Sequence, residues 1–83
     1  MKSYSVYILR CNDNTFYTGI TTDIEKRLNE HNTSMRGAKY TRYRRPVELM
    51  YHESHIDKSS ALKREIFIKQ MKRDQKEALW ISG

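Results

Sequence analysis

The sequence is poor in cysteine, in glycine and in long hydrophobic runs, and each shortage excludes a class of protein. A single cysteine, Cys11, cannot form an internal disulfide bond, which excludes a small secreted domain held together by disulfides. The three glycines form neither of the glycine-rich patterns that bind nucleotide phosphates. No hydrophobic run approaches the ~18 residues that a transmembrane helix needs, so we expect no membrane span.

Metal-binding and targeting patterns are also missing. The one cysteine and the three histidines lack the spacing of a zinc site. The N-terminal residues lack the apolar stretch and the cleavage site of a secretion signal, so we expect a cytoplasmic protein. A length of 83 residues allows one small domain, and we expect residues 1–83 to form it.

Positive charge is abundant and unevenly distributed. Sixteen lysines and arginines against ten acidic residues give a net charge of +6. Positions 36 to 45 contain no acidic residue and hold five of the positive ones, which are Arg36, Lys39, Arg42, Arg44 and Arg45. A local excess of this kind favours binding to a polyanion such as a nucleic acid or an anionic membrane surface. The alternative is a solvated basic face that only keeps the protein in solution.

The N-terminal part of the chain predicts a β-hairpin. Residues 4–11 and 15–21 are rich in β-branched and aromatic side chains, and the Asn-Asp-Asn run at 12–14 is typical of a turn. A three-residue loop pairs Tyr7 with Gly19 and Leu9 with Tyr17, so that both tyrosines lie on one face of the sheet. Because Gly19 has no side chain, we expect room for a phosphate opposite Tyr7.

A helix is predicted to follow the hairpin. Thr22 and Glu25 fit a capping box, in which a hydroxyl and a carboxylate bind the first free amides of the helix. The helix should reach position 31 or 32, and helical spacing places Arg27 and His31 on the same face as the apolar Ile24. A cation and an imidazole on the side that packs toward the sheet indicate a role other than contact with solvent.

The remainder of the chain predicts one more strand and further helices. Residues 33–46 carry no hydrophobic period, which indicates a basic connector with one helical turn at 39–43, closed by Pro46. Residues 47–53 predict a third strand. Asp57 or Ser59 should begin a helix to about position 71, and residues 75–81 should form a short last one. The order ββαβα(α) predicts an α+β fold, a three-stranded antiparallel sheet flanked by helices.

Two tyrosine triplets and two later charged residues carry a family resemblance. In chain order they are Val6-Tyr7-Ile8, Tyr17-Thr18-Gly19, Arg27 and Glu65. This order and spacing resembles the GIY-YIG nuclease superfamily, and the resemblance covers nearly the whole chain. Three further segments look like the small stand-alone bacterial members, and like the repair branch that processes branched DNA: His31-Asn32, Tyr40-Thr41 and Arg44-Arg45-Pro46.

The resemblance implies a metal-dependent endonuclease that hydrolyses phosphodiester bonds in DNA, with a structural preference or a role in DNA repair. The catalytic residues that it implies are Tyr7, Tyr17, Arg27, His31 and Glu65, with Gly19 as a structural residue of the site. An arginine offers a forked donor to phosphate oxygens. Glu65 is expected to hold one divalent cation, Mg²⁺ or alternatively Mn²⁺. Tyr7 should be the general base beside Tyr17, with nearby positive charge favouring the phenolate, although the sequence does not assign the two roles.

The basic segment is the expected DNA-binding surface. Its cations would contact phosphates, and its tyrosines offer faces on which unpaired bases stack. The predicted nucleic-acid-binding residues are Arg36, Lys39, Tyr40, Arg42, Tyr43, Arg44 and Arg45. Without a second binding domain, low sequence specificity is expected. We also expect the side chains of Arg42, Arg44 and Arg45 to be unnecessary for the core, so that replacing all three weakens only DNA binding.

Each candidate residue also has an ordinary structural interpretation. A tyrosine in a strand commonly packs in the core, Arg27 could pair with Asp23, and His31 could lie at a helix C-terminus, where an imidazolium is favoured. Glu65 could form an i, i+4 ion pair with Lys69. The late asparagine of the family has no counterpart near the end of the chain. The alternative function is therefore a nucleic-acid-binding module of the same fold that is catalytically silent or needs a partner subunit.

Overall fold

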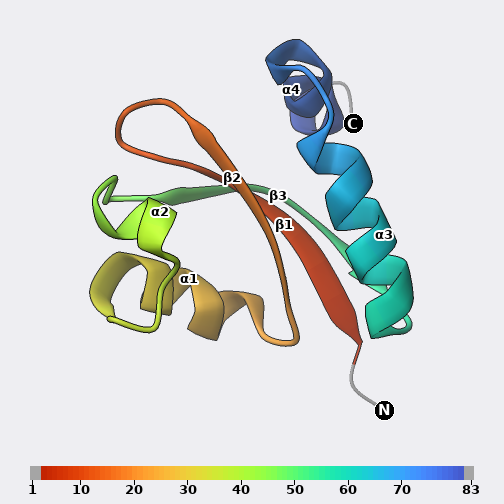
Figure 1. Cartoon of the computed structure of the whole chain (residues 1–83), viewed down its shortest axis with the longest axis horizontal. Helices are drawn as coiled ribbons and strands as arrows, with labels where there is room; N and C mark the ends of the chain where they lie inside the picture. The colour runs from red at the N-terminus through yellow and green to blue at the C-terminus, as the bar shows by residue number, and fades with distance from the viewer. Residues whose placement is uncertain (1–2, 82–83) are drawn as a thin grey trace.

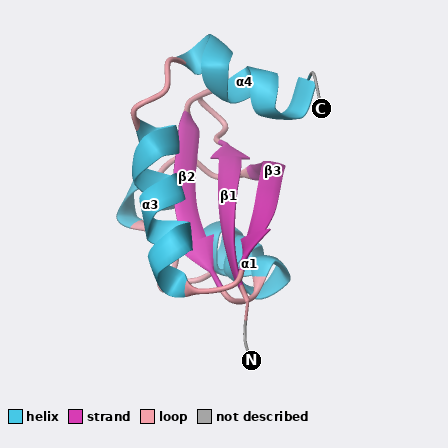
Figure 2. Cartoon of the chain, turned by 90° about the vertical axis from the view of Figure 1, so that its right-hand side faces the viewer, coloured by secondary structure: helices cyan, strands magenta, loops and turns pink. Residues whose placement is uncertain are grey.

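The sheet has three antiparallel strands with the first strand in the middle. The computed structural model describes residues 3–81. Its strands β1 (Tyr4–Arg10), β2 (Phe16–Thr21) and β3 (Glu48–His55) lie in the order β2-β1-β3 (Figure 2). Because β1 pairs on both edges and is covered on both faces, four consecutive residues from Val6 to Leu9 are buried. The predicted α+β fold and its element order are confirmed.

The hairpin has the predicted register. Cys11 N–H donates to the Thr15 carbonyl at 2.8 Å, which closes the three-residue loop. Asn14 takes a positive φ of 69°, a conformation that asparagine tolerates better than most residues. Tyr7 consequently pairs with Gly19, and Leu9 with Tyr17.

The helices form one layer on each face of the sheet (Figure 1). Helices α1 (Ile24–Thr33) and α2 (Lys39–Arg42) cover one face, and α3 (Lys58–Lys69) and α4 (Arg73–Ile81) cover the other. The helical turn predicted at 39–43 is thus confirmed. None of the helices in residues 3–81 is long and apolar enough to cross a membrane.

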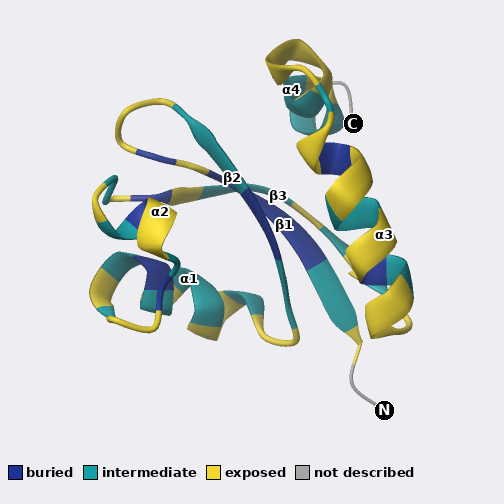
Figure 3. Cartoon of the chain, in the orientation of Figure 1, coloured by how far each residue is buried: buried dark blue, intermediate teal, exposed yellow. Residues whose placement is uncertain are grey.

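Alternation along β1 supplies both cores, because successive side chains of a strand point to opposite faces. Val6 and Ile8 pack with Ala61 and Ile68 on the α3 face. On the α1 face the buried cluster consists of Tyr7, Leu9, Cys11 and Val47. Figure 3 shows the buried residues gathered along β1, between the two layers, and an exposed outer side of α3.

The predicted capping box of α1 is wrong. The N-cap is Asp23, whose Oδ1 accepts a hydrogen bond from the Lys26 amide at 3.1 Å. Thr22 lies one residue before the cap, and Glu25 is simply an acidic residue in the first turn. A carboxylate at the N-cap binds the free amides and is also favoured by the helix dipole, so Asp23 takes the position. In α3 the predicted cap at Asp57 is confirmed, and Ser59 lies inside the helix.

Three later boundaries differ from prediction by a few residues. Strand β3 extends to His55 because this residue pairs with Tyr4. Helix α3 ends at Lys69 instead of position 71. Helix α4 begins at Arg73 because the Gln75 side chain accepts a hydrogen bond from the Lys72 amide at 2.9 Å, which places Gln75 within the first turn.

Candidate active site

Both tyrosines of the triplets lie on the α1 face of the sheet. Their ring centroids are 6.5 Å apart. Tyr7 is 2% exposed, whereas Tyr17 is half-buried. The ring of Tyr40 stacks on Tyr17 at 6.0 Å, and the Arg44 guanidinium lies 3.8 Å from the Tyr40 ring centroid. A ladder of planar groups therefore leads from the exposed connector to the buried phenol of Tyr7.

Gly19 makes room for the Tyr7 side chain. A Cβ atom at Gly19 would lie 2.6 Å from the Tyr7 hydroxyl oxygen, closer than such atoms approach. The space that we expected for a phosphate is thus occupied by the phenol itself, and that expectation is wrong. The glycine fixes where the hydroxyl lies, because the ring of Tyr7 crosses directly over the backbone of β2.

His31 connects Tyr7 to the connector segment. It is fully buried at 0% exposure, and its Nε2 lies 2.8 Å from the Tyr7 hydroxyl. Its Nδ1 lies 2.7 Å from the Thr41 hydroxyl. Burial, with help from the nearby Arg27 guanidinium, lowers the pKa of His31 to about 4. The imidazole is therefore neutral at pH 7, and the interpretation of His31 as an imidazolium at a helix C-terminus is wrong.

The phenols are protonated in the free protein. Burial raises the pKa of Tyr7 to about 12, and the charges of Tyr17 and Glu65 add to this, while Arg27 opposes it. Burial likewise raises the pKa of Tyr17. We expected positive charge to favour the phenolate, but the loss of solvation outweighs the effect of Arg27.

Arg27 projects toward the tyrosines from α1. It lines a narrow crevice together with apolar residues of the α1 face and Tyr7. Its Nη1 donates to the Glu30 carboxylate at 3.2 Å and to the Arg36 carbonyl at 2.8 Å. The alternative pairing with Asp23 is not found, since the Asp23 side chain instead accepts from the Lys26 amide. The guanidinium is thus held beside the phenols by acceptors on its own helix and on the connector.

Glu65 approaches the site from the other helical layer. Its side chain is 16% exposed and lies 3.7 Å from Lys69 Nζ, so the predicted i, i+4 pair is present. Its negative charge contributes to the raised pKa of both Tyr7 and Tyr17, which places the carboxylate within electrostatic reach of the two phenols. Among residues 3–81 no group of three or more His, Cys, Asp or Glu side chains could hold a metal ion. A single carboxylate still suits a hard cation that takes its other ligands from water and phosphate oxygens.

The arginines of the connector have structural roles that the sequence did not indicate. Arg45 Nε donates to the His31 carbonyl at 2.5 Å, and Arg45 Nη2 donates to the Ser34 carbonyl at 2.5 Å, so Arg45 binds backbone carbonyls at the end of α1. Arg44 joins the hairpin loop through Asp13 at 3.0 Å. Arg42 donates to the Met35 carbonyl at 3.1 Å. The three side chains lie outside the two core clusters, as expected, but replacing them should cost stability as well as DNA binding.

The other predicted DNA-binding side chains are open to solvent. Arg36, Lys39 and Tyr43 are exposed, and Tyr40 is partly covered by Arg44. Of the seven predicted residues, these four are the ones whose side chains the fold leaves available at the surface of the connector.

Two polar residues of the site were not predicted. Thr41 is fully buried against His31, and its only sequence indication was its place beside Tyr40 in a segment typical of the small bacterial members. Asn32 binds both backbone groups of Val47, accepting from its amide at 2.8 Å and donating to its carbonyl at 3.1 Å. It thereby fixes the end of α1 against the start of β3.

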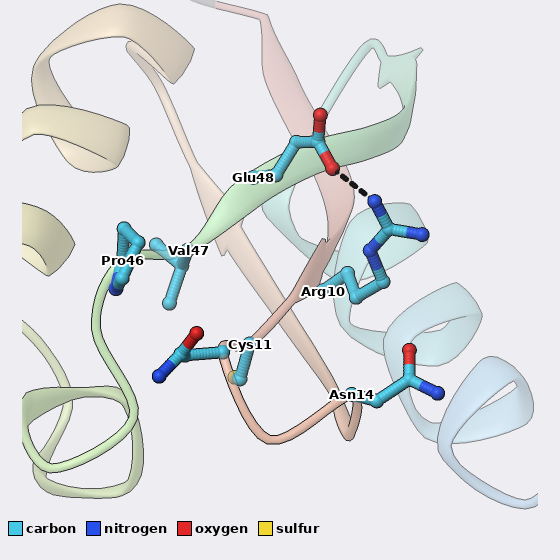
Figure 4. A pocket seen from close by; sticks show the side chains of 7 residues that line it. Arg10, Cys11, Asn14, Pro46, Val47 and Glu48 are labelled. Carbon is cyan, nitrogen blue, oxygen red and sulfur yellow. Dashed lines mark hydrogen bonds and ion pairs between the residues drawn. The ribbon is translucent and has the colours of Figure 1, made fainter.

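A separate depression does not belong to this site. It measures about 410 Å³ at the loop end of the sheet, and Arg10 and Glu48 form an ion pair at 2.6 Å on its wall (Figure 4). Burial raises the pKa of the Cys11 thiol that also lines it, so this thiol is not an activated nucleophile. None of the five candidate catalytic residues lines the depression.

The fold and these contacts define a class of protein: a small α+β domain with two phenols, a neutral imidazole and a guanidinium on one face of its sheet. These groups can move a proton and bind an anion at one place. The chain belongs to the GIY-YIG family, because residues 3–78 match the family described as the GIY-YIG catalytic domain. Membership of this family implies a nuclease, a hydrolase whose substrate is nucleic acid.

Individual proteins from bacteria and archaea are similar along most of this chain. UPF0213 protein VNG_2274C of Halobacterium salinarum is 53% identical over 77 residues, which cover 93% of this chain and 99% of that protein. UPF0213 protein DP2720 of Desulfotalea psychrophila is also 53% identical over 77 residues, covering 93% of this chain and 70% of that protein. The predicted family is confirmed.

Solved structures agree with the fold. The solution NMR structure of protein EF2693 from E. faecalis is 47% identical, with a TM-score of 0.64, and the match covers 93% of this chain and 81% of that chain. The solution NMR structure of UPF0213 protein BH0048 from Bacillus halodurans is 42% identical, with a TM-score of 0.58 and the same coverage of 93% and 81%.

Proposed function

We propose that this protein is a metal-dependent endonuclease that hydrolyses phosphodiester bonds in DNA, with Tyr7, Tyr17, Arg27, His31 and Glu65 as its catalytic residues. The observation that carries the proposal is the 2.8 Å contact between the Tyr7 hydroxyl and Nε2 of a buried, neutral His31. We further propose that residues 1–83 form a single domain of this kind.

The Tyr7–His31 pair solves the problem of using tyrosine as a base. A phenol with a pKa of about 12 is protonated at neutral pH, so it can accept a proton from water only if it gives up its own. Neutral His31 is placed to take that proton at Nε2. As the water oxygen forms its bond to phosphorus, its proton passes to the Tyr7 oxygen, and the phenolic proton passes to Nε2 of His31. The bond from phosphorus to the leaving oxygen breaks at the same time, and this oxygen departs as an alkoxide that takes a proton from solvent. Tyr17 lies beside this path and orients the water.

Arg27 binds the attacked phosphate in this proposal. A guanidinium presents several donors in a fixed plane, which suits two phosphate oxygens at once. Its present acceptors, Glu30 and the Arg36 carbonyl, hold it at the phenols before substrate arrives. The negative charge that develops on the phosphate in the transition state is stabilised by a donor that is already in position.

Glu65 would hold the divalent cation, Mg²⁺ or Mn²⁺. Once bound there, such a cation would supply positive charge at the phosphate and at the leaving oxygen. Because Glu65 is a single carboxylate and also pairs with Lys69, we expect the cation to bind weakly when no DNA is present.

DNA would lie across the connector. Exposed Arg36 and Lys39 can neutralise phosphates, and the exposed ring of Tyr43 offers a face on which a base can stack. Tyr40 lies beside them, covered by Arg44 and stacked on Tyr17. These contacts carry little sequence information, so we propose recognition of DNA structure, such as branches met during repair, with low sequence specificity.

The test is a cleavage assay on single-stranded, flapped and duplex DNA with Mg²⁺, with Mn²⁺ and with a chelator. Wild type should cut only with metal, and Glu65→Ala should lower the rate about 10²-fold or more while DNA binding holds. Glu77→Ala is the matched control, because Glu77 also pairs with a basic residue at i, i+4 at 3.7 Å. Equal rates for the two variants would remove Glu65 from the site.

The missing late asparagine supports a second candidate function, a nucleic-acid-binding module that is silent or needs a partner subunit. It predicts salt-dependent DNA binding by wild type, with no cleavage under any of these metal conditions.

A further inference from the structure

Thr41 is a fully buried polar residue that the catalytic proposal does not use. It lies in α2 at 0% exposure. Its hydroxyl oxygen is 2.7 Å from Nδ1 of His31 and 3.0 Å from the Ala38 carbonyl oxygen. The Ala38 carbonyl also accepts from the Arg42 amide at 3.1 Å, so the contact that depends most on the Thr41 hydroxyl is the one with Nδ1 of His31.

The direction of each hydrogen bond follows from the number of protons available. Among the described residues, Nε2 of His31 is the one possible acceptor that lies at hydrogen-bond distance from the buried Tyr7 hydroxyl, so the phenolic proton points to it. Neutral His31 then carries its proton on Nδ1 and donates it to the Thr41 oxygen. The single proton of Thr41 goes to the Ala38 carbonyl. In this arrangement each of the three short contacts contains one proton.

We infer that Thr41 is a positioning residue that holds His31 in the tautomer protonated at Nδ1, so that the Nε2 lone pair faces the Tyr7 hydroxyl. The inference rests on the proposed function in one respect, namely that His31 accepts the Tyr7 proton. The other neutral tautomer would present an N–H to the Tyr7 oxygen and could not accept that proton.

A competing donor beside the ring gives Thr41 a specific task. The Ala38 amide lies 3.4 Å from Nδ1 and favours a ring whose Nδ1 is unprotonated. The Thr41 oxygen is nearer, at 2.7 Å, and accepts the stronger hydrogen bond. When the hydroxyl is removed, the Ala38 amide is the remaining neighbour of Nδ1. We therefore expect loss of the hydroxyl to transfer the ring proton to Nε2, even if the fold is unchanged.

Two substitutions separate this role from simple packing. Thr41→Val keeps the volume and branching of the side chain and removes the hydroxyl, whereas Thr41→Ser keeps the hydroxyl and removes a methyl group. If Thr41 only fills space, valine is the milder change. If Thr41 sets the tautomer, serine is the milder change.

The direct measurement is the ¹⁵N spectrum of the imidazole nitrogens at pH 7, which distinguishes the two neutral tautomers, with His31→Gln used for assignment. Wild type and Thr41→Ser should carry the proton on Nδ1, and Thr41→Val should carry it on Nε2. A wild-type ring protonated on Nε2 would overturn the inference, and so would a folded Thr41→Val variant with the wild-type tautomer. The wild-type and serine spectra decide the matter if the valine variant fails to fold.

Cleavage rates provide the second readout. Thr41→Val should lower the rate about 10²-fold, the usual contribution of a correctly placed base, and Thr41→Ser should stay within a few fold of wild type. Thr33→Val is the control. Thr33 lies in α1, the helix that carries His31, and the substitution removes a hydrogen bond from its hydroxyl to the Asn29 carbonyl at 2.7 Å without removing a contact to His31. If the wild type never cleaves DNA, the proposed function is refuted. The ¹⁵N spectra would still test whether Thr41 sets the tautomer of His31. A valine variant that is fully active would overturn the role of Thr41 alone.

Discussion

Each face of the sheet carries a hydrogen-bond network that contains a tyrosine, a histidine and an arginine. The two networks differ in the group that accepts the hydrogen bond of the tyrosine hydroxyl, which is a carboxylate on one face and an imidazole on the other. On the α3 face a carboxylate is the centre: Tyr51, His55 and Arg64 bond to Glu53 at 2.6, 2.5 and 3.1 Å. On the α1 face the Tyr7 hydroxyl contacts the imidazole of His31 directly, at 2.8 Å.

The central carboxylate makes the α3 network self-sufficient. Burial opposes ionisation of Glu53, but the hydrogen bonds from Tyr51, His55 and Arg64 lower its pKa below the ordinary range. Its charge is neutralised within the fold, and no lone pair is left for a substrate. In the α1 network, by contrast, the neutral imidazole of His31 contacts the Tyr7 hydroxyl and can accept its proton. Residue types alone therefore do not identify a site, since the position of the negative charge decides whether a proton can move.

The largest difference should appear in cleavage when each face loses its tyrosine hydroxyl. We expect Tyr7→Phe to lower the cleavage rate by roughly 10²- to 10⁴-fold, because it removes the group that passes the proton. Tyr51→Phe should leave the rate within a few fold and lower the free energy of unfolding by about 1 kcal/mol. Rates in Mg²⁺ and urea denaturation measure both effects. Comparable rate losses in the two variants would show that the Tyr7 hydroxyl has no specific role in cleavage.

The two faces should also lose stability in different pH ranges. The folded protein holds the pKa of His31 at about 4 instead of 6.5, so below pH 6.5 the unfolded chain binds a proton that the folded chain does not. Stability should fall by about 3 kcal/mol between pH 6.5 and 4, since each unit of pKa corresponds to about 1.4 kcal/mol. Glu53, whose pKa is lowered from 4.5, stabilises the fold above that value, and its contribution is lost as the pH falls further.

Urea denaturation at pH values from 7 to 3 tests this assignment. His31→Gln should flatten the curve between pH 6.5 and 4, and Glu53→Gln should flatten it below 4.5. If His31→Gln keeps the slope of wild type, His31 is not the buried neutral group that we describe.

The smallest effect separates structural from substrate-binding cations within the α1 face. Arg45→Ala should lower the free energy of unfolding by about 2 kcal/mol, because it removes charge-assisted bonds to the end of α1. Arg36→Ala should change the free energy of unfolding by less than about 0.5 kcal/mol. It should weaken DNA binding and reduce the slope of the logarithm of the binding constant against the logarithm of the salt concentration by about 1, which corresponds to one lost phosphate contact. Fluorescence anisotropy at several salt concentrations measures the second effect. An unchanged salt dependence in Arg36→Ala would mean that this side chain does not contact DNA.

The parts of the structure that depend on local chemistry were predictable from the sequence. The Asn-rich turn fixed the pairing of Tyr7 with Gly19, and helical spacing put Arg27 and His31 on the face toward the sheet. The cap of α1 shows the limit of such reasoning. Thr22 and Asp23 are both good N-cap residues, and the choice depends on where the chain leaves β2.

What could not be predicted depends on contacts between distant segments. Nothing near Arg45 in the sequence indicates that its guanidinium reaches back to the carbonyls of His31 and Ser34. The direction of the pKa shifts of Tyr7 and His31 follows from burial, which a single sequence does not reveal. Positive charge in the connector suggested only a substrate-binding role, although part of that charge holds the segment in place.

The three-residue hairpin loop has a consequence for how this protein tolerates insertions and deletions. Substitutions at 12–14 act locally, and Asn14 is the most restricted of them because of its positive φ. A change of one residue in loop length acts on all of β2 at once, because it reverses which side chains face each helical layer. Phe16 would then enter the site and Tyr17 the apolar core. The length of this turn, more than its composition, keeps Tyr17 on the face of the proposed site and Phe16 in the apolar core of the other face.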